Sequence, residues 1–285
     1  MSSSKDIKQG RPADLAKRQA MRATLLVTRL RRIPIVRTVH NLHPHEVGTR
    51  AEQNLLARVD RRTSTFIRLN PTTELEEGMC GATILHGHYR GRFAAHPRAE
   101  KRRGRVLYFG IIRPYKNVEH LIDVFTSRER PGVDLRIVGS PSAELGERIS
   151  ARVDTEPSVS ARLAFVDDDE LVREITASEL VVLPYAEMHN SGAALVALSL
   201  DRPILVPRTP SNEALRDEVG PDWVLLYDGD LTDEILTGAI ERAQTLDRSE
   251  RPRLEGRDWD EVGRQHLAVY RAALEAARNR KGRIA

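Results

Sequence analysis

The sequence predicts an α/β protein with two parallel-sheet domains, of which the first is unusually small. Short apolar runs alternate with amphipathic segments along almost the whole chain, which is the pattern of βαβ units. Residues 95–104 interrupt this alternation with a charged stretch that has no apolar periodicity, as expected of a linker between domains. Six strand–helix repeats follow the stretch and only three strands precede it, so two Rossmann-like domains of unequal size are expected.

The first domain is expected over residues 1–94 and opens with a helix over residues 12–32. Leu15, Met21 and Leu25 fall mostly on one side of that helix, and basic residues occupy the other sides. Strands are predicted at residues 33–41, 65–70 and 82–88, with a polar loop at 42–53 and helices at 54–63 and 72–79. Three strands make an incomplete sheet, which leaves an edge open to pairing with another chain.

The second domain is expected over residues 105–258 and alternates more regularly. Its strands are predicted at residues 106–112, 134–139, 162–166, 179–185, 203–207 and 223–229. Its helices are predicted at residues 118–127, 142–153, 168–177, 191–200, 212–219 and 232–246. Because each strand is followed by a helix, a doubly wound Rossmann-like sheet is indicated. A last helix is predicted at residues 259–278.

Composition narrows the class of protein. The chain of 285 residues contains one cysteine, Cys80, so a disulfide framework is excluded and a reducing compartment is expected. The apolar runs are far shorter than the roughly 20 residues that span a bilayer. The first residues lack the apolar core of a signal peptide. These features together predict a cytoplasmic protein.

The charge is distributed unevenly along the chain. The net charge is only +4, yet residues 1–105 contain 22 Lys and Arg against 9 Asp and Glu. Such an excess suggests a membrane surface, a phosphorylated substrate or nucleic acid as partner, and it equally fits a solvated arginine-rich surface. Nucleic acid is disfavoured, because aromatic residues make up 5% of the chain and none is interleaved with the N-terminal cations.

The turns that follow the strands carry the candidate chemistry, because ligands of open α/β sheets bind beyond the carboxyl ends of the strands. In the turn GIIRPYKN, Arg113 and Lys116 follow the first strand of the second domain. Asn190, Ser191 and Gly192 begin an apolar helix, and the free N–H groups of a helix start attract anions. Ser191 is also a good helix cap. Two cations and a helix start at one sheet edge indicate the phosphates of a nucleotide.

Several ordered segments resemble family 4 of the GT-B glycosyltransferases. They are the run FGIIRPYKN with its helix VEHLIDVF, then LRIVG, RLAFVDDDEL and ELVVLPY, and finally NSGAALVALSLDRPILVP. The stretches TVHNLHPHE and ILHGHYR resemble N-terminal segments of bacterial exopolysaccharide members of the family. The resemblance implies two Rossmann-like domains in the GT-B arrangement, the N-terminal one truncated. It also implies that residues 259–285 pack back toward the first domain.

The resemblance further implies a reaction and its donor site. A sugar would be transferred with retention of configuration from a UDP- or GDP-sugar, without a metal or another cofactor. Gly110, Arg113 and Lys116 match the turn that holds the donor diphosphate, where two cations would neutralise the charge on the leaving group. The leaving phosphate would then help to deprotonate the acceptor hydroxyl.

Contacts to the base and the sugar are implied at other turns. The base would lie against the turn from Val166 to Leu171, largely through backbone contacts. The acidic side chains at residues 167–170 are interpreted instead as a helix cap with first-turn acids. His40 matches the histidine that ends an N-terminal strand of the family and approaches the donor sugar.

A metal site is the competing interpretation of the histidines. His40, His43 and His45 crowd one turn together with Glu46, and His86 and His88 end a neighbouring predicted strand. Two or three imidazoles with a carboxylate could ligate zinc, although the spacing matches no closed structural zinc pattern. The resemblance explains His40 without a metal and suggests a hinge or cleft-lining role for the other two.

Two features depart from the family pattern. Members commonly carry two glutamates separated by seven residues near the last phosphate-binding helix, and the matching positions here are Met188 and Val196. Glu187 lies beside the first position and would substitute for it if the loop shifts. The first domain is also short and lacks an opening strand with a glycine-rich turn. The chain is therefore expected to be a degraded copy, a sequence with a mis-assigned start or one half of a two-chain enzyme.

We therefore predict a glycosyltransferase that uses a nucleotide-sugar donor and a polysaccharide or glycolipid acceptor. The basic helix over residues 12–32 would make peripheral contact with the inner membrane surface, where lipid-linked acceptors reside. Its apolar stripe would equally pack on the sheet. The alternative function is a nucleotide-sugar-binding module without transferase activity, either vestigial or dependent on a partner.

Overall fold

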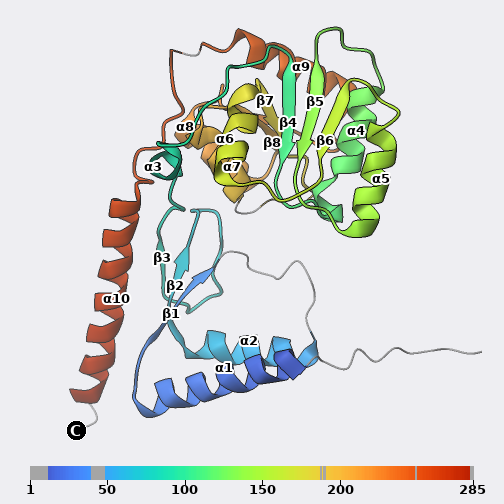
Figure 1. Ribbon diagram of the computed structural model, residues 1–285. Helices are drawn as coiled ribbons and strands as arrows, with labels where there is room; N and C mark the ends of the chain where they lie inside the picture. The colour runs from blue at the N-terminus through green and yellow to red at the C-terminus, as the bar shows by residue number, and fades with distance from the viewer. Residues whose placement is uncertain (1–11, 40–48, 187, 189–190, 248, 283–285) are drawn as a thin grey trace, which may run out of the picture. The chain divides into compact units, whose positions relative to one another are not determined.

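The structure, a computed structural model, describes residues 12–39, 49–186, 188, 191–247 and 249–282. The chain divides into two compact units (Figure 1). Unit 1 comprises the described parts of residues 1–69, 73–84 and 263–285, and unit 2 those of residues 70–72 and 85–262. Each unit contains one parallel sheet, so the predicted α/β class with a smaller first half is confirmed.

Unit 2 contains a six-stranded parallel sheet with the strand order β6-β5-β4-β7-β8-β9. Its strands are β4 (Arg105–Phe109), β5 (Asp134–Val138), β6 (Val159–Arg162), β7 (Leu180–Val182), β8 (Ile204–Pro207) and β9 (Val224–Tyr227). The chain builds outward in one direction from β4 and in the other direction from β7. The boundary between these two neighbours is therefore the switch point, where ligands of doubly wound sheets bind.

Helices alternate with the strands of this sheet. They are α4 (Val118–Thr126), α5 (Ala143–Val153), α6 (Asp168–Ala177), α7 (Gly192–Ser199), α8 (Pro210–Val219) and α9 (Asp233–Thr245), with the short α3 (Arg90–Phe93) and the 3-10 helix η1 (Pro114–Lys116). Strand residues such as Leu107 and Ile137 are fully buried, and Leu121 and Ile149 of the helices join them in one hydrophobic core. Such apolar strands are typical of parallel sheets that helices cover.

Unit 1 contains a three-stranded parallel sheet with the order β1-β2-β3. Its strands are β1 (Ile35–Val39), β2 (Thr63–Arg68) and β3 (Gly81–Thr83), and its helices are α1 (Pro12–Leu30), α2 (Arg50–Arg62) and most of α10 (Trp259–Gly282). Among the described residues, no strand pairs with the outer edge of β1. No helix in this described part of the chain is long and apolar enough to cross a membrane.

Helix α1 ends at a residue in the left-handed conformation. The N–H of Arg32 donates to the C=O of Arg29 at 3.2 Å, and the N–H of Ile33 donates to the C=O of Thr28 at 2.8 Å. These two bonds form a Schellman motif, whose left-handed position is usually occupied by glycine. Here Arg32 occupies it with φ +55°. A residue with a Cβ costs about 1–2 kcal/mol in this conformation.

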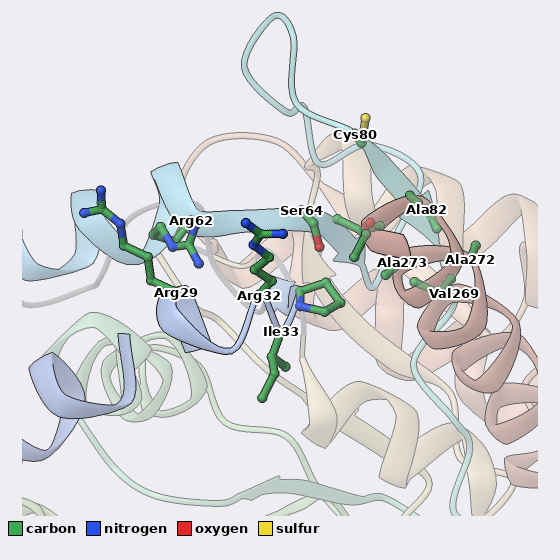
Figure 2. Close-up of a pocket in the computed structure, with 14 residues that line it drawn as sticks. Arg29, Arg32, Ile33, Arg62, Ser64, Cys80, Ala82, Val269, Ala272 and Ala273 are labelled. Carbon is green, nitrogen blue, oxygen red and sulfur yellow. The ribbon is translucent and has the colours of Figure 1, made fainter. Parts of the chain in front are cut away.

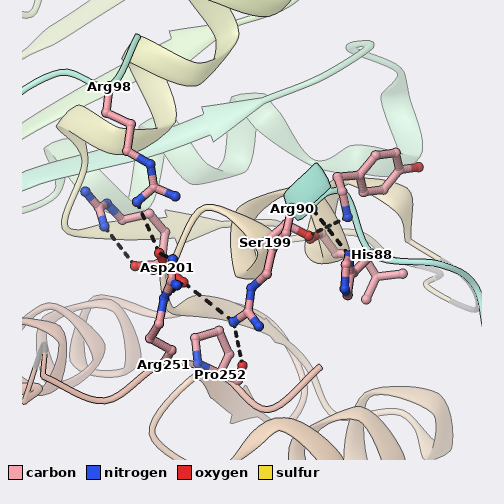
Figure 3. Close-up of polar contacts among 10 residues, drawn as sticks. His88, Arg90, Arg98, Ser199, Asp201, Arg251 and Pro252 are labelled. Carbon is pink, nitrogen blue, oxygen red and sulfur yellow. Dashed lines mark hydrogen bonds and ion pairs between the residues drawn. The ribbon is translucent and has the colours of Figure 1, made fainter. Parts of the chain in front are cut away.

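Polar contacts attach the segment between β3 and β4 to unit 2 (Figure 3). Asp201, in the turn between α7 and β8, accepts hydrogen bonds from Arg251 at 2.7 and 3.1 Å. Arg98 donates to the same carboxylate at 3.1 Å, and Arg90 lies 3.7 Å from it. Residues 95–104, the predicted linker, also pair with this unit, since Glu179 accepts a hydrogen bond from the N–H of Gly104 at 2.7 Å.

The helix predicted at residues 72–79 is wrong, because this stretch is a loop with two turns. The side-chain oxygen of Asn70 accepts hydrogen bonds from the N–H and the hydroxyl of Thr72, both at 2.9 Å. Local side-chain bonds of this kind compete with helix formation. Gly78, with φ +85°, then turns the chain toward β3.

Other element boundaries also differ from the prediction. β6 begins and ends before the strand predicted at residues 162–166 and shares only Arg162 with it, because Val159 is buried and pairs with Leu135, whereas Phe165 is 84% exposed. β3 is shorter than the strand predicted at residues 82–88. α2 begins before the helix predicted at residues 54–63, because Thr49 and Glu52 form a capping box at its start.

Candidate functional site

The turns after β4 and β7 meet at the switch point of the unit 2 sheet. β4 ends at Phe109 and continues into the turn GIIRPYKN, and β7 continues through Leu183 to Tyr185. The N–H of Ala186 donates to the C=O of Tyr115 at 2.8 Å, so the backbones of the two turns are joined. The structure thus brings together two turns that the sequence analysis assigned to one site.

Two glycines allow the first of these turns to lie against β5. Gly110 has φ +117°, a conformation that residues with a Cβ rarely adopt. A Cβ added at Gly139 would lie 1.9 Å from the carbonyl oxygen of Gly110, so only glycine fits there. The N–H of Gly110 also donates to the C=O of Val138 at 2.9 Å. Gly110 was predicted as a site residue from the sequence, whereas Gly139 was not.

Arg113 and Lys116 flank one turn of 3-10 helix. Arg113 directly precedes η1 and is exposed, whereas Lys116 is its last residue and is half-buried. The N–H of Lys116 donates to the C=O of Arg113 at 2.9 Å. The Nζ atom of Lys116 lies 4.6 Å from the centroid of the Tyr185 ring, within cation–π range. The ring therefore holds the Lys116 ammonium beyond the strand end, and the charge of Arg113 is near enough to act on it.

The electrostatics of this turn favour an anionic ligand. Among the described residues, no carboxylate lies within 4 Å of either Arg113 or Lys116. Burial and the positive charge of Arg113 lower the pKa of Lys116, because both disfavour the charged form of the amine. An anion bound between the two cations would counteract both effects.

Three tyrosines form the aromatic side of the site. The ring of Tyr185 packs edge-on against those of Tyr108 and Tyr115, with centroids 6.5 and 6.4 Å away. Burial raises the pKa of Tyr108 and of Tyr185, so both hydroxyls stay protonated at neutral pH. Tyr185 was not among the residues predicted for the site. Its position at the end of the apolar run LVVLPY, directly before the loop that leads into α7, was the available signal.

Helix α7 begins at the same edge of the sheet. The side-chain oxygen of Ser191 accepts a hydrogen bond from the N–H of Ala194 at 3.2 Å, which confirms that Ser191 caps this helix. A Cβ added at Gly192 would lie 3.6 Å from the hydroxyl oxygen of Tyr89, so Tyr89 reaches the start of α7. Glu187 and Asn190, also predicted for this loop, lie outside the described residues.

The turn predicted to contact the base leads into α6. Asp167 caps this helix by accepting a hydrogen bond from the N–H of Glu170 at 2.9 Å, so the interpretation of its side chain as a cap is confirmed. Val166 and Leu171 are half-buried and pack against the core of unit 2. Phe165, which was not predicted as a site residue, is 84% exposed beside them. The turn therefore presents backbone and one free aromatic ring.

The predicted histidines divide into two groups. His40, His43 and His45, with Glu46, lie outside the described residues. His88 is buried, and its Nε2 atom lies 2.9 Å from a carboxylate oxygen of Asp258, whereas His86 bonds to the neighbouring backbone. Within the described part of the chain, no group of His, Cys, Asp and Glu could hold a metal ion.

Comparison with solved structures identifies the fold, although no family model matches the chain. HepE from Anabaena in complex with UDP has a TM-score of 0.67 at 15% identity, covering 90% of this chain and 77% of that one. Sucrose-phosphate synthase from Thermosynechococcus elongatus has a TM-score of 0.63 at 17% identity, covering 90% and 72%. At these identities the likeness shows a shared fold, the GT-B fold.

Sequence comparison supplies the family. Two proteins from Xanthomonas campestris pv. campestris, each described as a GDP-mannose:glycolipid 4-beta-D-mannosyltransferase, are 43% identical to the chain over 261 residues. The match covers 91% of this chain and 74% of each relative. The chain belongs to the GT-B glycosyltransferases. The resemblance seen in the sequence motifs is confirmed at the level of this GT-B family and its fold.

In this GT-B glycosyltransferase most of the residues predicted to bind the donor lie at the switch point of unit 2. Gly110, Arg113 and Lys116 come from the turn after β4, and Ser191 and Gly192 from the start of α7. Their contacts with a donor remain predictions, as do those of residues outside the described part of the chain.

Proposed function

We propose that this GT-B glycosyltransferase transfers a mannosyl group from GDP-mannose to a glycolipid acceptor. The observation that carries the proposal is the 43% identity, over 91% of the chain, to proteins named for that reaction. The nucleotide-sugar donor and lipid-linked acceptor expected from the sequence agree with it. Of the two donor nucleotides expected, the relatives favour GDP.

The turn between β4 and α4 is the proposed site of the donor diphosphate. Arg113 and Lys116 supply two positive charges there, and α7 begins with N–H groups at the same sheet edge. When the bond between the sugar and the phosphate breaks, negative charge grows on GDP. Cations and N–H dipoles that are already in place stabilise this charge more than they stabilise the bound donor. Their role is therefore both to bind the donor and to assist its departure.

We infer inversion at the anomeric carbon in place of the retention that the sequence motifs implied. The mannosyl group of GDP-mannose is α-linked, and the Xanthomonas relatives are named for a β-linked product, so their reaction inverts. A retaining course finds no support in these relatives. In an inverting displacement the acceptor oxygen attacks the face opposite to the phosphate. The leaving phosphate is then out of reach of the acceptor proton, so a base of the protein must take it.

We propose His40 as that base. It directly follows β1, at the carboxyl end of a parallel strand, although it lies outside the described residues. An imidazole, with an ordinary pKa of about 6.5, is suited to proton transfer near neutral pH. In the proposed step the acceptor hydroxyl loses its proton to the imidazole of His40 while the acceptor oxygen forms a bond to the anomeric carbon of mannose. The bond between this carbon and the phosphate oxygen breaks at the same time, and the electron pair of that bond leaves with GDP.

The configuration of the product tests this proposal. The purified chain is incubated with GDP-mannose and a short lipid-linked saccharide, and the new linkage is determined by NMR. We expect a β-mannosyl product from GDP-mannose and none from UDP-glucose. The double variant R113A/K116A should lower transfer by about a hundredfold or more, since groups that stabilise the negative charge of a transition state contribute that much to catalysis.

Other outcomes of this assay are equally informative. An α-mannosyl product would show retention and would remove the need for His40 as a base. GDP binding by calorimetry without any transfer would favour the alternative of a nucleotide-sugar-binding module. Unchanged GDP affinity in R113A/K116A would contradict the proposed donor site itself.

A further inference from the structure

We propose that a cavity in unit 1 binds the phosphate-bearing lipid portion of the acceptor. The cavity lies between the end of α1, strands β2 and β3, and α10, and has a volume of about 600 Å³ (Figure 2). This volume is within the range of pockets that hold small-molecule ligands. The inference rests on the proposed transfer to a glycolipid. It concerns residues separate from the turn between β4 and α4 with Arg113 and Lys116, which is called the donor turn below.

One side of the cavity is cationic. Arg29, Arg32 and Arg62 line it, and Figure 2 shows them on the side away from α10. Among the described residues, no carboxylate lies within 4 Å of these three side chains, whereas nearby Arg37 is paired with Asp60. Arginines without carboxylate partners are suited to binding phosphate. The cluster formed by these three residues is called the arginine cluster below.

Arg32 is the residue of this cluster that local structure does not explain. Arg29 and Arg62 lie in the last turns of α1 and α2, where a positive charge is favourable in itself. Arg32 instead holds the left-handed position of the Schellman motif, with φ +55°, where glycine would relieve the backbone. A strained backbone at a residue that lines a cavity points to a function of its side chain.

The opposite side of the cavity is apolar. Val269, Ala272, Ala273 and Ala276 line it from one face of α10 at spacings of three and four residues. Their small side chains leave room for a hydrocarbon chain.

A lipid phosphate combines the two chemical features that the cavity presents. Its phosphate would lie in the arginine cluster, and the first part of its hydrocarbon chain would lie along α10. Inorganic phosphate would use only the cationic side, and an uncharged long-chain alcohol only the apolar side. A glycolipid acceptor carried on a phosphate therefore fits the cavity better than either part alone.

Direct binding of dodecyl phosphate to the full chain tests the site. We expect calorimetry to show saturable binding at concentrations below micelle formation, with inorganic phosphate and dodecanol each binding at least about tenfold more weakly, since each lacks one set of contacts. The variant R32G/R62Q should lose about tenfold or more in affinity. R32G relieves the left-handed strain, so the loss should come without a fall in melting temperature.

Two further variants separate the site from general effects. R58Q removes one charge from α2 at an exposed residue that does not line the cavity, and it should bind dodecyl phosphate like the wild type. Ala276→Leu keeps the arginine cluster and fills part of the apolar side, so it should weaken dodecyl phosphate but leave inorganic phosphate unchanged. Equal losses in R58Q and R32G/R62Q, or no loss in either, would overturn the proposal.

A transfer assay then connects the site with the acceptor. We expect R32G/R62Q to raise the KM for a lipid-phosphate-linked acceptor about tenfold, with an unchanged KM for GDP-mannose. Transfer to the same saccharide on a short uncharged aglycone should be unaffected. Equal KM values for the lipid-linked acceptor in variant and wild type would contradict the lipid site alone. Absence of transfer to every acceptor by the wild type would contradict the proposed function, and with it the identity of the lipid.

Discussion

At the scale of single residues, Lys116 is held where its own charge is disfavoured. The turn after β4 buries part of the side chain, and Arg113 adds a second positive charge nearby. The aromatic face of Tyr185 offsets part of this cost through the cation–π contact at 4.6 Å. A bound diphosphate would offset the rest, so the affinity for GDP and the charge of Lys116 are coupled.

This coupling predicts a pH dependence of GDP binding. Because burial and Arg113 lower the pKa of Lys116, GDP affinity should begin to fall with rising pH earlier than an ordinary lysine would allow. K116R stays charged throughout, so its affinity should remain flatter between about pH 7 and 10. Calorimetric titration with GDP over this range measures the affinity of each protein. The ratio of the two affinities at each pH is free of the ionisation of the nucleotide, because that ionisation affects both proteins equally. K101R is the matched control, because it makes the same replacement at a lysine that forms an ion pair with Glu179 away from the donor turn. Parallel curves for K116R and wild type would contradict the coupling.

Residue-scale features were predictable from the sequence where a local pattern specified them. The caps at Ser191 and Asp167 follow from short polar residues placed before helices, and both are present. The presence of both Arg113 and Lys116 in one turn follows from their spacing in the sequence. Tyr185 was missed because its contact with Lys116 joins two strands that are distant in sequence, and no local pattern reports such a contact.

At the scale of secondary-structure elements, the close approach of β4 and β5 fixes the donor turn. The carbonyl of Gly110 occupies the space that a side chain at position 139 would need. Parallel neighbours in a sheet are held by their ladder hydrogen bonds, so this oxygen has little freedom to move away. The backbone of the donor turn is therefore set by β5 as well as by β4.

A substitution at this approach should affect stability and donor binding together. Gly139→Ala would place a Cβ 1.9 Å from the oxygen of Gly110, and overpacking of this kind costs about 1–3 kcal/mol of unfolding free energy. GDP affinity should fall as well, because the donor turn must shift. Urea unfolding and GDP titration measure both effects.

The matched control lies in a helix with free space. A Cβ at Gly238 in α9 would meet no atom within 4 Å, and alanine there should raise stability by about 0.5–1 kcal/mol. If Gly139→Ala were as stable as the wild type, the two strand ends could separate without cost and the proposed constraint would be wrong.

Elements were predicted well where apolar periodicity was strong and poorly where side chains bond to the backbone. The strands β5, β7 and β8 lie within the runs expected of them. The false helix at residues 72–79 arose because its composition favours a helix, while Asn70 holds the preceding turn through Thr72. β6 was displaced because Phe165, an apolar residue expected in a strand, is on the surface.

At the scale of the whole chain, Asp201 joins segments that are distant in sequence. It binds Arg98 before β4 and Arg251 before α10, and lies near Arg90. Burial alone would raise the pKa of Asp201, but the hydrogen bonds from Arg251 and Arg98 outweigh it and hold the pKa below its ordinary value. One ionised carboxylate therefore joins the segment before β4 and the segment before α10 to the turn between α7 and β8.

The sign of this pKa shift predicts acid sensitivity. Since the folded pKa of Asp201 is lowered, its contribution is complete above the unfolded pKa of about 3.9 and is lost as pH falls through the folded pKa. D201N should reduce the unfolding free energy by about 1.5–3 kcal/mol at neutral pH and flatten its decline below about pH 4. Asparagine tolerates the left-handed backbone at this position, φ +59°, so the change isolates the charge.

Urea unfolding of D201N and wild type between about pH 3 and 7 measures this effect. D217N, at a carboxylate with 72% of its side chain exposed, is the control and should match the wild type. A D201N curve that ran parallel to the wild type at all pH values would show that the arginines do not depend on the charge of Asp201.

The number of sheets and their unequal size were predictable, because each βαβ repeat leaves its own local pattern. The attachment of residues 85–104 to unit 2 was not predictable. It depends on arginines that contact Asp201, and on Glu179, which accepts a hydrogen bond from the N–H of Gly104. Charged residues without apolar periodicity look alike in a sequence whether they are solvated or paired. Only their partners, distant in the chain, distinguish the two.

Cys80 offers a position for a fluorescent label at the cavity of unit 1. It is the single cysteine of the chain, it is exposed, and it lines the cavity beside β3. A polarity-sensitive dye with a maleimide group would therefore attach to the unmodified chain at one known position. Its emission would shift to shorter wavelength when a hydrocarbon chain displaced water next to it, so occupancy of the cavity would become visible in a fluorimeter.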